Sequence, residues 1–201
     1  MRVEAQPNAS PRRRRAGILA RRLRRLPRDQ RGALSFEAVL ILPVLIIFFV
    51  ATFVFFDLFR TANTNAKAAY AIADLLSRQN APVSEDYLDG LADVYSVLAR
   101  SHQPSTLRVS SIDWNPVTED YRIRWSRGTH GGEPLSEERL TALVDAGRLP
   151  FLTVGETIIL VETSLTYTPV VKMGIPVQRF IHVIPTRPRF VPRLVLQGGI
   201  S

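Results

Sequence analysis

The chain has 201 residues, a net charge of +8 and no cysteine. The lack of cysteine excludes a disulfide framework, a zinc–thiolate site and a thiol nucleophile. Residues 1–31 contain eleven arginines against Glu4 and Asp29, a local net charge of +9, so the other 170 residues sum to −1. Such a basic arm is typical of a membrane topology signal, although basic tracts also bind anionic lipid or nucleic acid. It has no aromatic stacking residues and no recognisable binding fold, so we expect no nucleic-acid partner.

An uncharged apolar run follows the basic arm at residues 38–56. As a helix, its 19 residues span about 28 Å, close to the hydrocarbon thickness of a bilayer. A cleaved secretory signal has a shorter apolar region followed closely by small residues, whereas the nearest such site here is Ala66-Lys67-Ala68. The run therefore predicts a retained transmembrane helix at residues 33–57. By the positive-inside rule, residues 1–32 form a cytoplasmic leader and the C-terminal part is exported.

The helical period continues beyond the apolar run. Polar residues such as Asn63, Asn65 and Lys67 are expected on one face. Residues 58–80 are thus predicted to extend the same helix, which would run from about residue 33 to residue 79 and measure roughly 70 Å. Its small side chains permit close packing, either on the chain's own globular domain or on partner subunits. The apolar stripe, spaced by four and three residues, consists of Leu58, Ala62, Ala66, Ala69, Ala73 and Leu76.

Residues 81–201 read as a periplasmic α+β domain with an antiparallel sheet. Asn80-Ala81-Pro82 breaks the helical pattern, and the remaining length of about 120 residues is enough for one hydrophobic core. The first predicted element is a helix that is capped by Ser84 and reaches Leu98, followed by a hairpin of strands at 107–114 and 121–125 and a glycine loop at 128–132. A second helix is predicted at 137–146, capped by Ser136 and closed by Gly147. The last two predicted strands are at 156–167 and 180–184.

Few residues of this domain suggest chemistry. Its histidines are scattered without metal-ligand spacing, and the glycine loop lacks the lysine and Ser/Thr of a phosphate loop. Three aromatic residues on the predicted hairpin could form a ligand platform or belong to the core: Trp114, Tyr121 and Trp125. We therefore expect no catalytic residue, no metal and no cofactor.

The junction between leader and apolar run reads Gly32-Ala33-Leu34-Ser35-Phe36-Glu37, and Pro43 follows Glu37 by six residues. This composite resembles the start of the TadE/TadG-like pseudopilins of tight-adherence (Flp-type) pilus systems, which are similar to type IV prepilins. That family often has an aromatic residue after the glutamate, where this chain has Ala38. Weaker similarities follow in the family's order at residues 66–71, 161–169 and 186–190.

The resemblance implies a non-catalytic, pseudopilin-like component of pilus assembly or related secretion machinery in the bacterial inner membrane. The implied partners are a prepilin peptidase, other pilin-like subunits, pilus assembly proteins and the inner membrane itself. Processing would cut between Gly32 and Ala33 and leave a new α-amine on Ala33. Glu37 would pair with such an amine, which offsets the cost of a carboxylate in an apolar helix, and Glu37 and Pro43 would be subunit-packing residues.

Glu37, Pro43 and the chain as a whole also have simpler interpretations. Glu37 could contact lipid headgroups at the membrane interface. Pro43 removes one backbone donor and is expected to loosen the turn at Val39, but proline is tolerated in membrane helices. The whole chain could instead be an unprocessed, membrane-tethered periplasmic ligand-binding or sensory module, or an exported enzyme.

Overall fold

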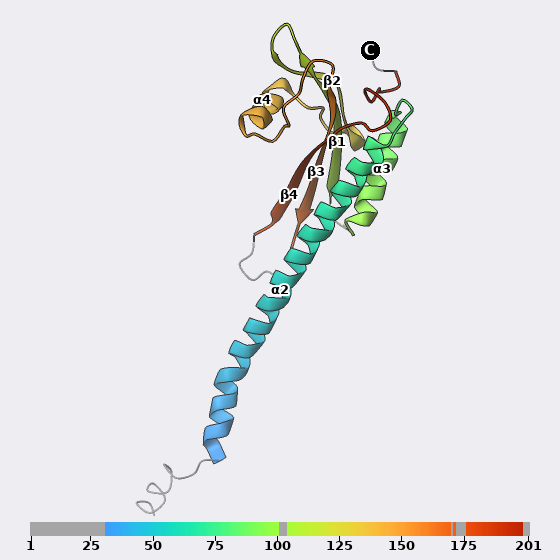
Figure 1. Ribbon diagram of the computed structural model, residues 1–201. Helices are drawn as coiled ribbons and strands as arrows, with labels where there is room; N and C mark the ends of the chain where they lie inside the picture. Colours follow the sequence, from blue (N-terminus) through green and yellow to red (C-terminus); the bar gives the residue numbers. More distant parts are fainter. Residues whose placement is uncertain (1–30, 101–103, 170, 172–175, 199–201) are drawn as a thin grey trace, which may run out of the picture. The chain divides into compact units, whose positions relative to one another are not determined.

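The computed structural model describes residues 31–100, 104–169, 171 and 176–198, with side chains from Phe36 onward. Residues 1–30, most of the predicted leader, lie outside this range. The elements, drawn in Figure 1, are α2 (Arg31–Ser77), α3 (Glu85–Leu98), β1 (Ser105–Asn115), β2 (Asp120–Gly128), the 3-10 turn η2 (Thr129–Gly131), α4 (Glu137–Asp145), β3 (Thr157–Tyr167) and β4 (Gln178–Thr186). They belong to two compact units, Met1–Thr52 and Phe53–Ser201, and we call the second unit the head.

Helix α2 is the long helix predicted from the apolar run and its amphipathic continuation. It begins and ends within two residues of the expected positions and continues through Pro43. Its most apolar stretch has a mean hydropathy of 3.1 and is 6 % buried. By length and composition, α2 is therefore able to cross a membrane.

The head is built on a four-stranded antiparallel sheet with the strand order β2-β1-β3-β4. The pairing of β1 with β2 confirms the predicted hairpin. In Figure 1, α3 and the C-terminal part of α2 lie on one face of this sheet, and α4 lies on the other. The predicted α+β class with an antiparallel sheet is confirmed, and a long N-terminal apolar helix packed on such a sheet is a pilin-like layout.

The helix ends follow the capping signals in the sequence. The Ser84 hydroxyl accepts a hydrogen bond from the Tyr87 N–H at 3.1 Å, and the Ser136 hydroxyl accepts one from the Arg139 N–H at 3.2 Å. Gly147 follows α4 with φ of 63°, the left-handed conformation that glycine adopts without a steric penalty. Both predicted short helices are therefore confirmed at their start and their end.

Strand β4 is longer than predicted by two residues at each end, and at its C-terminal end it continues past a proline. Pro185 lies opposite Leu160 in the register with β3. Within the described residues β4 pairs with β3 alone, so it is an edge strand. A proline on an edge strand sacrifices no hydrogen bond on the open side.

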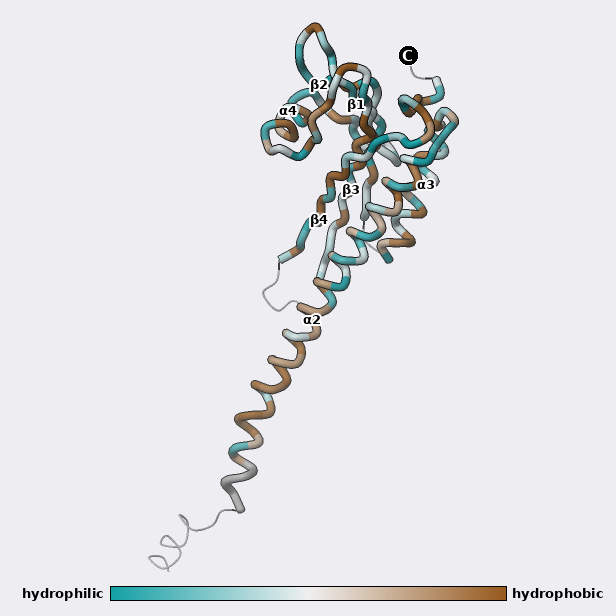
Figure 2. Tube along the Cα trace, viewed as in Figure 1, coloured by the Kyte–Doolittle hydropathy of each residue, from teal (hydrophilic) through white to brown (hydrophobic). Residues whose placement is uncertain are grey.

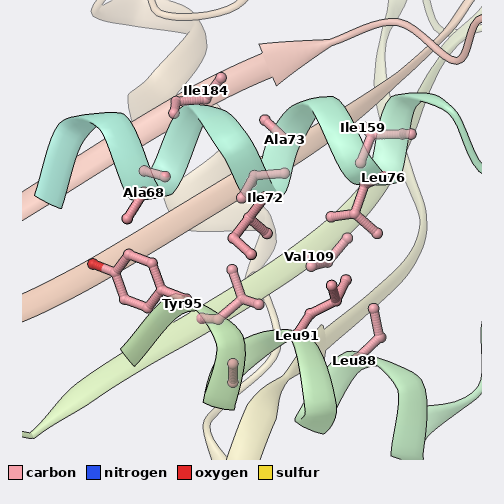
Figure 3. Packing of buried hydrophobic residues seen from close by; sticks show 14 of the residues in the cluster. Ala68, Ile72, Ala73, Leu76, Leu88, Leu91, Tyr95, Val109, Ile159 and Ile184 are labelled. Atoms are coloured by element: carbon pink, nitrogen blue, oxygen red, sulfur yellow. The ribbon is translucent and has the colours of Figure 1, made fainter. Parts of the chain in front are cut away.

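One hydrophobic cluster lies between α2, α3 and the sheet. Figure 3 shows Ile72 and Leu76 of α2 facing Leu91 of α3, with Val109 and Ile159 contributed by β1 and β3. The alanine stripe of α2 takes part in this packing: Ala69, Ala73 and Leu76 are at most 3 % exposed. Of the two uses left open by the sequence, the C-terminal half of the stripe packs on the chain's own head.

A second cluster lies on the opposite face of the sheet, beneath α4. Trp114 and Tyr121 pack here edge to face, with ring centroids 5.4 Å apart. Trp125 packs against the other cluster, and its indole N–H donates to the Leu194 carbonyl at 2.9 Å. The three aromatic residues therefore lie on two different faces, and they form core contacts rather than one ligand platform.

Residues 189–197, which we call the closing segment, return across the end of α2. The Arg189 N–H donates to the Ser77 carbonyl at 2.8 Å. Further along, Val83 and Leu196 form a parallel bridge, and Leu194 is 2 % exposed. The closing segment thus seals the first hydrophobic cluster by backbone hydrogen bonds.

Candidate membrane and subunit-packing site

The N-terminal half of α2 leaves its apolar side chains uncovered. The large apolar residues from Phe36 to Phe49 are between 48 % and 72 % exposed, and Figure 2 shows this half as a nearly continuous hydrophobic helix. Apolar patches larger than a few hundred Å² mark surfaces that contact a membrane or another protein. The bare half of α2 is therefore a candidate surface for contact with lipid or neighbouring helices.

All four residues singled out from the sequence lie on α2. Gly32 and Ala33 are in its first turn, Glu37 is exposed about one turn later, and Pro43 is inside the helix. Within the described residues, Glu37 makes no hydrogen bond and no ion pair. It is also separated from Asp57 by a stretch without any charge. Glu37 is thus an exposed carboxylate at the start of an apolar helix, without a partner among the residues that the structure describes.

The junction proposed for processing is helical. Because α2 already begins at Arg31, the bond between Gly32 and Ala33 lies in the first helical turn. The first four N–H groups of a helix have no partner within the helix, so this turn is the easiest to unwind. A protease that requires an extended backbone would have to open this turn.

The turn of α2 directly after the apolar run is tied to the end of β3. The Tyr167 hydroxyl donates to the Asp57 carboxylate at 2.7 Å. Burial raises the pKa of Tyr167 to about 12, and the hydrogen bond and charge of Asp57 act in the same direction. Sequence patterns did not reveal this contact, because the two residues are 110 positions apart.

The structure corrects the placement of one polar residue. Asn65 was expected on the polar face of α2, but it is fully buried, and its side-chain carbonyl accepts a hydrogen bond from the Tyr95 hydroxyl. Burial raises the pKa of Tyr95, and the neighbouring Thr163 side chain opposes that rise. The buried arc of α2 is wider than the predicted stripe because both α3 and the sheet pack on it.

A hollow of about 370 Å³ on the α4 side of the head is lined by Glu162, which within the described residues is the most buried carboxylate in an ion pair. Its oxygens accept hydrogen bonds from Arg108 of the adjacent strand at 3.0 Å and from Arg139 of α4 at 3.4 Å. Arg179, on β4, donates to the Ser164 hydroxyl at 2.7 Å. The carboxylate therefore joins α4 to the sheet, and both of its oxygens are engaged in doing so.

A second charged cluster consists of Asp113, Arg122 and Arg124, and it should make the stability of the head depend on pH. Burial raises the pKa of Asp113, but hydrogen bonds and charge from Arg122 and Arg124 outweigh it, so the pKa lies below its ordinary value of 3.8. A lowered pKa in the folded state adds stability above the ordinary value, and this stability is lost as the pH falls through the folded value. We expect Asp113→Asn to destabilise the head at neutral pH and to approach wild type below about pH 4.

Urea unfolding in detergent at several pH values, followed by tryptophan fluorescence, measures this effect. Asp145→Asn changes an exposed aspartate at the end of α4 and should give a curve parallel to wild type. A constant difference between Asp113→Asn and wild type across the acid range would show that the arginine pairs do not control the titration.

No protein-family model, no curated protein and no solved structure matches this chain. The class is therefore defined by the structure itself: a pilin-like α+β head that continues from an apolar helix of membrane-spanning length. Within the described residues, no three His, Asp or Glu side chains are grouped so that they could hold a metal ion.

Proposed function

We propose that this chain is a non-catalytic, pseudopilin-like component of a tight-adherence (Flp-type) pilus assembly or a related secretion machine. Its apolar helix anchors it in the bacterial inner membrane, with the leader in the cytoplasm and the head in the periplasm. Its partners are a prepilin peptidase, other pilin-like subunits and pilus assembly proteins.

One observation carries the proposal: a single helix has two different surfaces along its length. The C-terminal half of α2 contributes Ile72 and Leu76 to the core of the head, whereas the N-terminal half is bare. The bare half has a carboxylate, Glu37, near its start. This division suits a subunit that presents a folded head while its anchor packs against lipid or like helices.

The helical junction favours a second candidate, an unprocessed membrane-tethered ligand-binding or sensory module. In this alternative Gly32 and Ala33 stay within α2, the leader is retained, and Glu37 contacts headgroups at the membrane interface. The two candidates differ in one chemical fact, whether the bond after Gly32 is cut.

Membranes containing the full chain, prepared with and without the prepilin peptidase, distinguish these candidates by N-terminal sequencing. Wild type should begin at Ala33 only when the peptidase is present. Gly32→Val should leave the precursor uncut, because a β-branched side chain blocks close approach to the backbone. A wild-type chain that keeps residue 1 in the presence of the peptidase would establish the permanent tether.

Glu37→Gln serves as the matched variant, since it lies beyond the cut and keeps the shape of the side chain. We expect it to be inserted and cut like wild type, but to lose most of its crosslinking to other pilin-like subunits because the freed amine has no charged partner. Normal crosslinking and normal piliation by Glu37→Gln would limit this carboxylate to an interfacial role.

A further inference from the structure

A small hollow opens beside α2 immediately after the apolar run. We call it the juxtamembrane hollow; it measures about 200 Å³ and lies between one face of α2 and the end of α3. This volume is below the ~300–1,000 Å³ typical of pockets for drug-sized ligands, so it suits a single small group. Its lining residues are Asp57, Arg60, Thr61, Thr64, Ala99 and Arg100.

Most of the polar side chains that line the hollow are hydrogen-bond donors that have no acceptor among the described residues. Within the described residues, no hydrogen bond or ion pair is made by the guanidinium groups of Arg60 and Arg100, nor by the hydroxyls of Thr61 and Thr64. Asp57, by contrast, already accepts the hydrogen bond from Tyr167. Two guanidinium groups against one engaged carboxylate favour an anion that can accept several hydrogen bonds at once.

The depth of the hollow follows from the rise of the helix. Phe56 is the last residue of the apolar run, and the next turns of α2 supply Arg60 and Thr64. At 1.5 Å per residue these two residues lie roughly 6 and 12 Å beyond the run. A bilayer has headgroup regions of roughly 5–8 Å on each side of its hydrocarbon core, so Arg60 lies at the level of the phosphates.

Arg100 occupies a position where its residue type is unusual. It follows the last turn of α3 with φ of 51°, a left-handed conformation that glycine or asparagine usually supplies at the end of a helix. At this position Arg100 lines the same hollow as Arg60. A cation also interacts favourably with a helix C-terminus, which is a separate, lipid-independent effect.

We infer that the juxtamembrane hollow binds the phosphate of an anionic phospholipid headgroup in the outer leaflet of the membrane that α2 spans. The guanidinium groups of Arg60 and Arg100 hold the phosphate oxygens, and the hydroxyl of Thr61, one residue after Arg60, donates to the same group. This inference rests on the proposed membrane anchor. The bound lipid fixes the depth of α2 and holds the end of α3 at the membrane surface.

Native mass spectrometry of the full chain in phosphatidylcholine bicelles, titrated with phosphatidylglycerol, tests the site. We expect about fivefold weaker phosphatidylglycerol binding for each of Arg60→Gln and Arg100→Gln. Arg148→Gln removes an exposed arginine outside the hollow and should bind like wild type. Inorganic phosphate added to bicelles without phosphatidylglycerol separates a free anion from a headgroup, and only the headgroup should bind.

Three results would contradict the inference, each in a distinguishable way. Equal phosphatidylglycerol binding by wild type and all three variants would mean that the protein associates with this lipid without a specific site. Arg100→Gln could also lower the stability of the head by the same amount with and without phosphatidylglycerol. Arg100 would then act only through its interaction with the C-terminus of α3, and not by binding lipid. A wild-type chain that is extracted from membranes by alkali would overturn the membrane anchor, and with it both proposals.

Discussion

Replacing Ile72 with alanine should lower the free energy of unfolding of the head by about 2–5 kcal/mol. Ile72 is fully buried between α2, α3 and the sheet, where Figure 3 shows it at the centre of the packing. Alanine removes three carbon atoms and leaves a cavity that the two helices and the sheet cannot close without moving together. The cost is therefore expected to include the cavity as well as the lost transfer free energy.

Urea unfolding of the full chain in detergent measures this change. Both tryptophans of the chain lie on the strands of the head, so their fluorescence follows the head alone. Ile46→Ala makes the same substitution in the same helix at a residue that is 53 % exposed, and should leave the unfolding curve unchanged. Equal effects of the two substitutions would mean that α2 does not belong to the core of the head.

Gly128→Ala should also destabilise the head strongly, by about 1–3 kcal/mol or more. A Cβ on Gly128 would lie 2.5 Å from the carbonyl carbon and oxygen of Gly132 and 2.8 Å from the carbonyl oxygen of Glu133. All of these atoms belong to the backbone, so no side-chain rotation can relieve the overlap. The turn after β2 would have to open. This opening would disturb the hydrogen bonds between the Thr129 hydroxyl and the backbone of Leu107.

The same substitution at Gly90 should have the opposite sign. Gly90 lies inside α3, and apart from its chain neighbours and the adjacent backbone of its own helix a new Cβ there would meet no atom within 4 Å. Alanine is a better helix former than glycine by roughly 0.5–1 kcal/mol, so Gly90→Ala should stabilise the head. Destabilisation by both substitutions, measured by the same urea unfolding, would contradict the explanation based on backbone overlap.

Features coded by neighbouring residues were predictable from the sequence. The apolar run and the caps at Ser84 and Ser136 depend on periods and spacings of a few residues, and they located α2, α3 and α4 within one or two residues. The alternation of β3 likewise gave its bounds to within one residue. Local hydrogen bonding and helical or strand periodicity are sufficient to fix such elements.

Features that join distant segments were not predictable in this way. The polarity of Asn65 favours a solvent-exposed position, and local spacing does not reveal Tyr95, whose hydroxyl donates to the Asn65 side-chain carbonyl inside the core. The contact between Asp57 and Tyr167 and the closing segment have no periodicity at all. The roles expected for Gly32 and Glu37 depend on a protease and on a second chain. The structure of a single chain gives the positions of these residues but does not test those roles.

The closing segment has a consequence for the order in which this protein forms. Val83 pairs with Leu196, so the two halves of this bridge are separated by nearly the whole head, and bringing them together carries the entropy cost of closing a very long loop. A ribosome produces the apolar half of α2 long before it produces Leu194, the residue that covers the first cluster. The apolar half of α2 can therefore be complete while the head is still open at this end. The nascent chain must pass through a stage in which its apolar helix is finished and the core of its head is not yet covered.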